Sequence, residues 1–203
     1  MSARIRGWCP GALRPMAAGD GLVVRIRPPG GWLDAAQAAG LASISADLAD
    51  GTLTLTLRGN LQLRGIAQAR HGAVLEQLAA LGLLDADPRI EARRNILVTP
   101  FADAGTDRIA AELARRLARP DAPDLPGKAG FVLDTGAHPV LSASPGDFRL
   151  ERAACGTLVL RAEGLEAGAP VTEAGAAEQM VALARWFLRE GGAAQGRMAR
   201  LAA

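Results

Sequence analysis

The stretch TLTLTLRGNLQLRGI, residues 52–66, alternates apolar and polar residues over more positions than one strand needs. Leu53, Leu55, Leu57, Leu61 and Leu63 fall on one side of the alternation. Because successive side chains of a strand point to opposite faces, the pattern predicts one apolar and one polar face. We expect a strand at residues 52–57 with its leucines in the core, followed by a loop at residues 58–65.

The segments around this stretch predict an alternation of strands and helices. A strand at residues 22–27 ends at Pro-Pro-Gly-Gly. Asp34 can cap a helix through the alanine-rich segment that follows, and Gly51 can stop it. Residues 66–84 have the apolar spacing of a second helix. This order is typical of a small α+β sandwich with helices on one face of a sheet.

The remaining residues predict a second α+β unit. Strands are expected at residues 95–99, 131–136, 148–150 and 157–161. We expect a helix at residues 107–117, capped by Thr106 or Asp107, and a long helix at residues 173–189, capped by Thr172. The last residues, from 191 on, are expected to form a turn and a frayed end. The sequence thus predicts an α+β protein with domains at residues 1–84 and 85–203.

Composition excludes several classes of protein. Of the 203 residues, 49% are hydrophobic and 22% charged, which is typical of globular proteins, and the net charge of +2 gives no argument for a nucleic-acid partner. The basic segments contain no aromatic residue on which bases could stack. No stretch approaches the roughly 20 apolar residues of a membrane span, and no signal peptide is visible. We therefore expect a cytoplasmic protein with no nucleic-acid or membrane partner.

Cysteine and histidine are too scarce for metal chemistry. Cys9 and Cys155 lie far apart, and His71 and His138 form no metal-binding or catalytic spacing with them. We expect Cys9, His71 and His138 to be structural, and we expect no metal site.

The polar side of the opening stretch favours an anion. Arg58, Asn60, Gln62 and Arg64 follow one another, and no acidic residue stands between Asp50 and Glu76. A guanidinium group is a planar fork that suits carboxylates and oxyanions. The alternative is a solvated edge strand whose arginines reach acids elsewhere in the fold.

Two further segments add cationic or amide groups. Arg94 and Asn95 lead into a predicted strand, and Lys128, the only lysine, lies in a Pro/Gly-rich loop. Loops on a rigid scaffold commonly carry ligand contacts. These residues are either ordinary surface charges or further contacts of one polyanion site.

Four segments in order carry a family resemblance: CPGALRPMAAGDGLVVRIRPPGG, LTLRGNLQLRGI, RRNILVTP and LPGKAGFVLD. Together they resemble the sirohaem-dependent nitrite and sulfite reductase family, and are most similar to its cobalamin-pathway branch. That branch hydroxylates precorrin-3A, a polycarboxylate tetrapyrrole, with molecular oxygen. The resemblance implies two pseudo-symmetric halves, each with a ferredoxin-like domain followed by a larger α+β domain.

The resemblance also implies roles for the residues singled out above. Arg58, Arg94 and Lys128 would line the cavity over the macrocycle and hold an anionic substrate or its carboxylates. Four residues would neighbour the macrocycle, here Asn60, Gln62, Arg64 and Asn95.

The sequence departs from the family in three respects. It corresponds to the N-terminal half only; the four cysteines of the family's [4Fe-4S] cluster are absent; and Gly130 stands where the reductases carry a second lysine. We expect a chain that binds an anionic tetrapyrrole, holds no cofactor alone and works with a second half-chain or as a homodimer. The alternatives are a fragment of a sirohaem nitrite or sulfite reductase, and a non-catalytic tetrapyrrole-binding half-domain.

Overall fold

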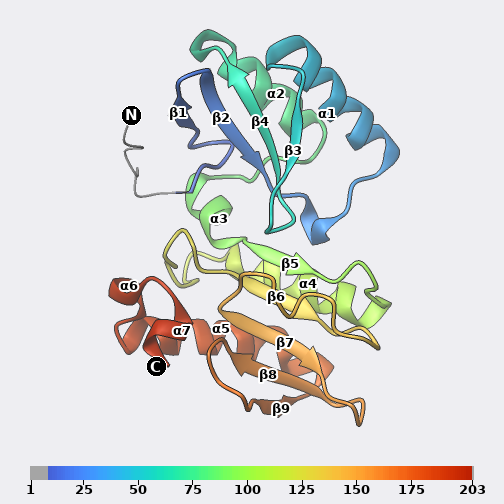
Figure 1. Ribbon diagram of the computed structural model, residues 1–203, viewed down its shortest axis with the longest axis vertical. Helices are drawn as coiled ribbons and strands as arrows, with labels where there is room; N and C mark the ends of the chain where they lie inside the picture. Colours follow the sequence, from blue (N-terminus) through green and yellow to red (C-terminus); the bar gives the residue numbers. More distant parts are fainter. Residues whose placement is uncertain (1–8, 203) are drawn as a thin grey trace.

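Two β-sheets, each covered by helices, make up the computed structural model, which describes residues 9–202 (Figure 1). The upper sheet is antiparallel, with the strand order β1-β2-β4-β3. Its strands are β1 (Met16–Ala18), β2 (Gly21–Ile26), β3 (Leu53–Leu55) and β4 (Leu61–Ile66). Two helices, α1 (Ala35–Leu48) and α2 (His71–Ala80), cover one face of it, preceded by the 3-10 helices η1 (Pro29–Gly31) and η2 (Gln68–Arg70).

The first helix begins at the predicted cap. Asp34 accepts a hydrogen bond from the backbone N–H of Gln37 at 2.7 Å, and the Gln37 side chain accepts one from the Asp34 N–H at 3.1 Å. This reciprocal pair is a capping box. The core between helices and sheet contains Leu22, Val24, Ile26, Leu41, Ile44, Leu63, Ile66, Val74 and Leu78.

Residues 52–66 form a hairpin instead of one strand followed by a loop. β3 ends at Leu55, the chain turns through Gly59 (φ +65°), and β4 then runs between β2 and β3. The expected loop at residues 58–65 is therefore wrong from Leu61 onward. The prediction that the first three leucines lie in the core is also wrong, since Leu53, Leu55 and Leu57 are 37%, 71% and 88% exposed. The reason is that β3 is an edge strand, beyond the cover of the helices.

The lower sheet has the order β5-β6-β7-β8-β9, with its first three strands parallel and the others antiparallel. These strands are β5 (Ile96–Val98), β6 (Phe131–Asp134), β7 (Phe148–Arg152), β8 (Leu158–Ala162) and β9 (Ala169–Val171). The short helix α3 (Pro88–Arg93) leads into β5. Helices α4 (Ala104–Leu117) and α5 (Glu173–Arg189) pack against each other and against the sheet.

The ends of this second unit differ from the sequence prediction. α4 begins three residues earlier than expected because Asp103, and neither Thr106 nor Asp107, is its cap, accepting from the Thr106 N–H at 2.7 Å. Thr172 caps α5 as predicted. The expected frayed end is wrong: α6 (Gly192–Gln195) and α7 (Met198–Leu201) follow, and Met198 is fully buried.

Each sheet has its own hydrophobic core. One buried cluster belongs to the upper sheet and its helices, and a second, larger one to the lower sheet with α4 and α5. The predicted α+β class is confirmed. We propose that the two clusters mark two domains that meet at residues 84 and 85.

Candidate functional site

Three of the singled-out segments meet where the two sheets approach each other. The Asn60 amide donates to the Asn95 side-chain oxygen at 3.5 Å, and the Asn95 amide donates to the Ala129 carbonyl at 3.1 Å. Both asparagines are buried. At Gly59 an added Cβ would lie 2.7 Å from the Leu97 side chain, so the hairpin turn sits against β5. The junction thus brings the 58–60, 94–95 and 128–130 segments together.

Gly130 is part of this contact. A Cβ added there would lie 2.7 Å from the Asn95 amide nitrogen and 3.3 Å from the Asn95 carbonyl oxygen. The Gly130 N–H donates to the Asp147 carboxylate at 3.1 Å. A longer side chain at position 130 therefore requires Asn95 to move.

Arg58 lies half-buried in the turn between β3 and β4. It makes no hydrogen bond or ion pair with any residue from 9 to 202. Burial lowers the pKa of Arg58 from its usual value; Cys9 opposes that shift, while the positive charges of Arg197 and Arg25 act with it. The guanidinium still stays protonated, because the ordinary pKa of arginine is so high.

Lys128 lies at the rim of a cavity of about 340 Å³ between its loop and the α6–α7 segment. The polar and thiol side chains that line this cavity are Cys9, Lys128, Gln195, Arg197 and Arg200. Arg197 donates to Asp147 at 2.9 Å and to the Gly146 carbonyl at 2.8 Å. Arg197 and Arg200 were not predicted as site residues, because their segment was expected to form a frayed end.

The Arg94 side chain does not line the cavity of Lys128. Its guanidinium donates to both carboxylate oxygens of Asp85, at 2.7 and 2.8 Å, and to the Arg27 carbonyl at 2.8 Å. It lines a separate cavity of about 330 Å³ beside Trp32. Arg94 and Lys128 therefore do not line one cavity, and the charge of Arg94 is compensated within the protein.

Arg64 and Gln62 lie on β4. Arg64 pairs with Asp20 at 3.0 and 3.3 Å, and this bond is the chief cause that lowers the pKa of the exposed Asp20. Gln62 stands beside Arg25 of β2 in the strand register. An acid distant in sequence thus reaches Arg64, as the alternative interpretation held, whereas Arg58 forms no ion pair or hydrogen bond with residues 9–202 and Asp147 acts on it only through space.

The sequence analysis also missed Arg27, at the end of β2. Its side chain is 6% exposed, and neither Nε nor Nη1 has a hydrogen-bond acceptor within residues 9–202. Glu91 lies 3.8 Å away, but its carboxylate accepts hydrogen bonds from the Ala12 and Leu13 N–H groups. Burial lowers the pKa of Arg27, and it is also the main cause that raises the pKa of Glu91. The available signal was an arginine directly after a largely apolar strand, with no acid between Asp20 and Asp34 in the sequence.

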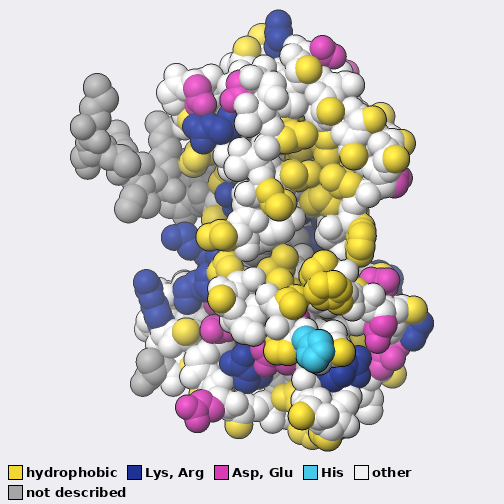
Figure 2. Space-filling view, turned by 45° about the vertical axis from the view of Figure 1, so that its right-hand side comes forward, with side chains coloured by type: hydrophobic (Ala, Val, Ile, Leu, Met, Phe, Trp, Pro, Cys, Tyr) yellow, Lys and Arg dark blue, Asp and Glu magenta, His cyan; other side chains and the backbone are white. Residues whose placement is uncertain are grey.

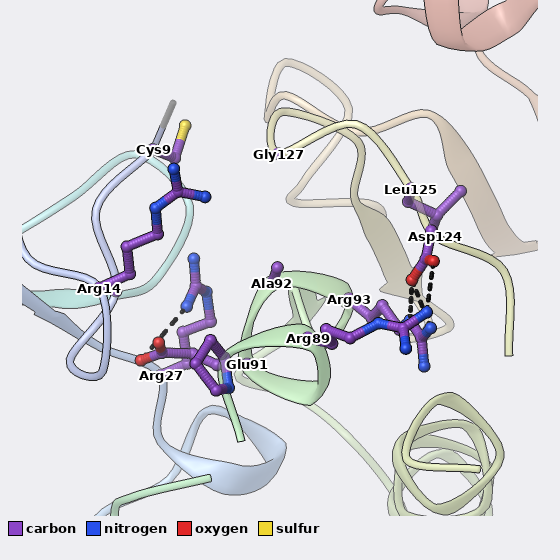
Figure 3. A pocket seen from close by; sticks show the side chains of 12 residues that line it. Cys9, Arg14, Arg27, Arg89, Glu91, Ala92, Arg93, Asp124, Leu125 and Gly127 are labelled. Carbon is purple, nitrogen blue, oxygen red and sulfur yellow. Dashed lines mark hydrogen bonds and ion pairs between the residues drawn. The ribbon is translucent and has the colours of Figure 1, made fainter. Parts of the chain in front are cut away.

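Arg27 faces a cavity of about 410 Å³ (Figure 3). Arg14 and Cys9 lie on the same side as Arg27, and Arg89 and Arg93 pair with Asp124 on the other (Figure 3). This cavity adjoins that of Lys128, because Cys9 and Gly127 line both. Figure 2 shows Lys and Arg side chains gathered on its left side, level with the junction of the two sheets. We call Arg27, Arg58, Lys128 and the two adjoining cavities the basic junction.

The residues do not fit an iron–sulfur cluster. A [4Fe-4S] cluster is typically held by four cysteine thiolates, and the sequence has two cysteines, both free. In the described part of the chain, no group of three His, Cys, Asp or Glu side chains could hold a metal ion. None of the helices within residues 9–202 combines the length and hydropathy needed to cross a bilayer.

The class of protein follows from comparison with known families. Residues 14–81 match the family described as the nitrite/sulfite reductase ferredoxin-like half domain. Residues 14–81 thus form the ferredoxin-like half domain of the nitrite/sulfite reductase family, and the chain has the α+β fold expected for the first half of such proteins.

Individual relatives narrow the resemblance. The chain is 36% identical over 153 residues to the precorrin-3B synthase of Sinorhizobium sp, covering 72% of this chain and 32% of that protein. It is 33% identical over 113 residues to sulfite reductase [ferredoxin] 2 of Mycolicibacterium paratuberculosis, covering 52% of this chain and 20% of the relative. The chain thus spans about a third or less of these proteins.

A solved structure shares the fold. The structure of the Mycobacterium tuberculosis NirA protein superposes with a TM-score of 0.64 and 22% identity, over 80% of this chain and 33% of NirA. This likeness supports the architecture of two joined α+β units.

Proposed function

We propose that this chain binds an anionic tetrapyrrole at the basic junction, as the N-terminal half of a precorrin-3B synthase-like protein of cobalamin biosynthesis. One observation carries the proposal: among residues 9–202, neither Arg58 nor the Nε and Nη1 groups of Arg27 have a hydrogen-bond acceptor, and Arg27 lines a cavity. The carboxylates of a macrocycle supply the missing acceptors, and such charge-assisted bonds are stronger than neutral ones. The 36% identity to a precorrin-3B synthase supports the choice of ligand.

The proposed reaction is the oxygen-dependent hydroxylation of precorrin-3A with closure of a lactone. Arg58, Arg94 and Lys128 act in it as electrostatic clamps and transfer no proton, because a guanidinium stays protonated. For Arg94 this role requires that a ligand carboxylate replace or join Asp85. The redox centre comes from a cysteine-bearing second half or from a separate partner.

A second candidate function is binding without catalysis. The presence of only two cysteines favours a half-domain that carries or presents a tetrapyrrole. The third candidate, a fragment of a sirohaem nitrite or sulfite reductase, is disfavoured because Asn95 packs against position 130.

Titration with uroporphyrin III, a carboxylate-rich tetrapyrrole, tests the proposal. We expect a shifted absorption band and a Kd that Arg58→Ala and Lys128→Ala each raise about tenfold, the loss of one ion pair of about 1.4 kcal/mol. Arg64→Ala, in which the guanidinium removed already has Asp20, is the matched control and leaves the Kd nearly unchanged. Absence of binding, or equal effects of Arg58→Ala and Arg64→Ala, would contradict the proposal.

An optical spectrum separates the catalytic alternatives. A Soret band in protein purified without oxygen would support the sirohaem reductase and overturn the synthase assignment. A spectrum without such a band, together with uroporphyrin binding, supports the tetrapyrrole-binding function.

A further inference from the structure

The edge of the upper sheet carries an apolar row that nothing in the described chain covers. Leu53 and Leu55 of β3 stand opposite Leu63 and Leu61 in the strand register, so they share the face that α1 and α2 cover. Leu63 is fully buried, whereas Leu55 is 71% exposed and Leu57, just beyond β3, is 88% exposed. The apolar surface of the core thus continues into solvent-exposed leucine side chains at this edge. We call β3 with Leu57 the leucine edge.

The backbone of the leucine edge is open as well. The Thr56 N–H donates to the Asn60 carbonyl at 2.8 Å, toward β4. In an antiparallel strand these groups alternate sides from residue to residue, so Leu53 and Leu55 point theirs away from β4. β3 is the last strand of the sheet on that side. The edge therefore offers a row of hydrogen-bonding groups to a further strand.

The leucine edge lacks the features that usually prevent strand pairing. Residues 52–57 contain no charged residue and no proline, the two side-chain devices that commonly guard an edge. Helix α1, on the same face of the sheet, has Asp47 as its one charged residue. Figure 2 shows hydrophobic side chains gathered in the upper part of the molecule on the face that it presents.

The charges that flank the edge favour a copy of the same strand as its partner. Asp50 precedes the uncharged segment and Arg58 follows it. When two such strands run antiparallel, the Asp50 carboxylates of the two copies lie at opposite ends of the pair, and so do the two Arg58 residues. Parallel pairing would bring like charges together, which is destabilising in a sheet. The edge is thus complementary to itself in one direction only.

We propose that the leucine edge pairs antiparallel with the leucine edge of a second copy of this chain. The two four-stranded sheets then form one continuous sheet across a two-fold axis, an isologous interface. A pair centred on Leu55 places Leu53 opposite Leu57 of the other copy. The six leucines then form one apolar surface that continues both cores. This proposal does not depend on the tetrapyrrole ligand.

The mass of the purified chain in solution, measured by sedimentation across a range of concentrations, tests this interface. We expect the wild type to shift from one copy to two as concentration rises. Leu55→Arg places a charge at the centre of the edge and should keep the protein at one copy. Leu165→Arg is the matched control, because Leu165 is 46% exposed between β8 and β9, away from this edge, and should dimerise like the wild type.

A second measurement, disulfide cross-linking, tests the interface even if an arginine variant misfolds or aggregates. Hydrogen-bonded residues that face each other in antiparallel strands have Cα atoms about 5.5 Å apart, within the range that a disulfide spans. Leu55→Cys, in a chain with Cys9→Ser and Cys155→Ser, should cross-link two copies on mild oxidation, whereas Leu165→Cys in the same background should not. A wild type that stays at one copy overturns the proposal, as does a Leu55→Arg protein that still dimerises. Equal cross-linking at positions 55 and 165 also counts against it.

Discussion

Two buried arginines in this molecule differ in their hydrogen bonding. Arg149, in the lower sheet, is fully buried and donates from Nε to Glu151 at 2.9 Å and from Nη1 to Glu163 at 3.0 Å. Its Nη2 donates to the Leu141 carbonyl at 2.6 Å, so the loop before β7 is fastened to the strand. Arg27, at the basic junction, is almost as buried, yet two of its nitrogens have no acceptor.

The difference separates structural from binding arginines. A buried guanidinium whose hydrogen bonds are all made internally holds two parts of the fold together, and it has no donor left for a ligand. A buried polar group without a partner costs stability, on the order of 1–3 kcal/mol. A protein that keeps such a group beside a cavity gains from it when an anion binds there. If the proposed function holds, the basic junction is the part of the molecule where stability and binding compete.

The largest expected effect is at Arg149. Arg149→Met removes a fully buried guanidinium and takes from Glu163 its hydrogen-bond donor, whereas Glu151 keeps Arg161 and the Leu141 carbonyl keeps the Ser144 N–H. We expect a loss of about 3 kcal/mol of unfolding free energy. Arg27→Met should cost clearly less, because Nε and Nη1 have no hydrogen-bond acceptor among residues 9–202 and the ion pair of Nη1 with Glu91 is long, at 3.8 Å. Urea unfolding of both variants measures the difference. Equal losses at the two positions would show that Arg27 is also structural.

The next largest effect on stability is expected at position 130, where there is little space for a side chain. Gly130→Lys forces a side chain against Asn95, and overpacking of this kind costs about 1–3 kcal/mol. Gly127→Lys, in the same loop, is the control, because an added Cβ there would lie 3.8 Å from the Cys9 backbone nitrogen, an ordinary contact distance. Thermal unfolding should show a lower Tm for the first variant only. If Gly130→Lys is as stable as the wild type, the contact between Asn95 and Gly130 does not decide which residue stands at position 130.

Glu91 makes the stability of the junction depend on pH. Burial raises the pKa of Glu91 above its usual 4.5, although hydrogen bonds from Ala12 and the charge of Arg27 oppose this. The folded state therefore holds the proton more tightly than the unfolded state in the window above 4.5. The contribution of Glu91 to stability is fully present below that pH and is lost as pH rises through the folded-state pKa.

Glu91→Gln removes this titration. Urea unfolding at a series of pH values should show the wild type losing stability relative to the variant as pH rises above about 4.5. A difference that stays constant with pH, or that grows in favour of the wild type, would contradict the raised pKa.

Much of the fold could be predicted from local patterns in the sequence. Asp34 and Thr172 mark the starts of two helices, because a cap acts on its own first turn. Leu55 shows where such reasoning fails. An alternating pattern gives the two faces of a strand, but only the position of that strand within the sheet decides whether its apolar face is covered. That position depends on pairings distant in sequence.

The site could be predicted only in part, for the same reason. The segments around Asn60, Asn95 and Lys128 do meet, but the sequence could not show that Asp85 compensates Arg94 or that Asp20 compensates Arg64. An ion pair between distant residues depends on the fold. The roles of Arg58, Arg94 and Lys128 as clamps stay a prediction.

The smallest expected changes in unfolding free energy are at Arg64 and Arg58, the two arginines of residues 52–66. The sign of the change at Arg58 distinguishes a structural role from a ligand-binding role. Arg64→Ala breaks an exposed ion pair with Asp20, for which we expect a loss of about 0.2–1 kcal/mol of unfolding free energy. Arg58→Ala removes a half-buried guanidinium with no partner among residues 9–202, so we expect no loss or a slight gain. Urea unfolding of both variants in one buffer measures this order. If Arg58→Ala is the more destabilising change, Arg58 holds the fold together and is not kept for a ligand.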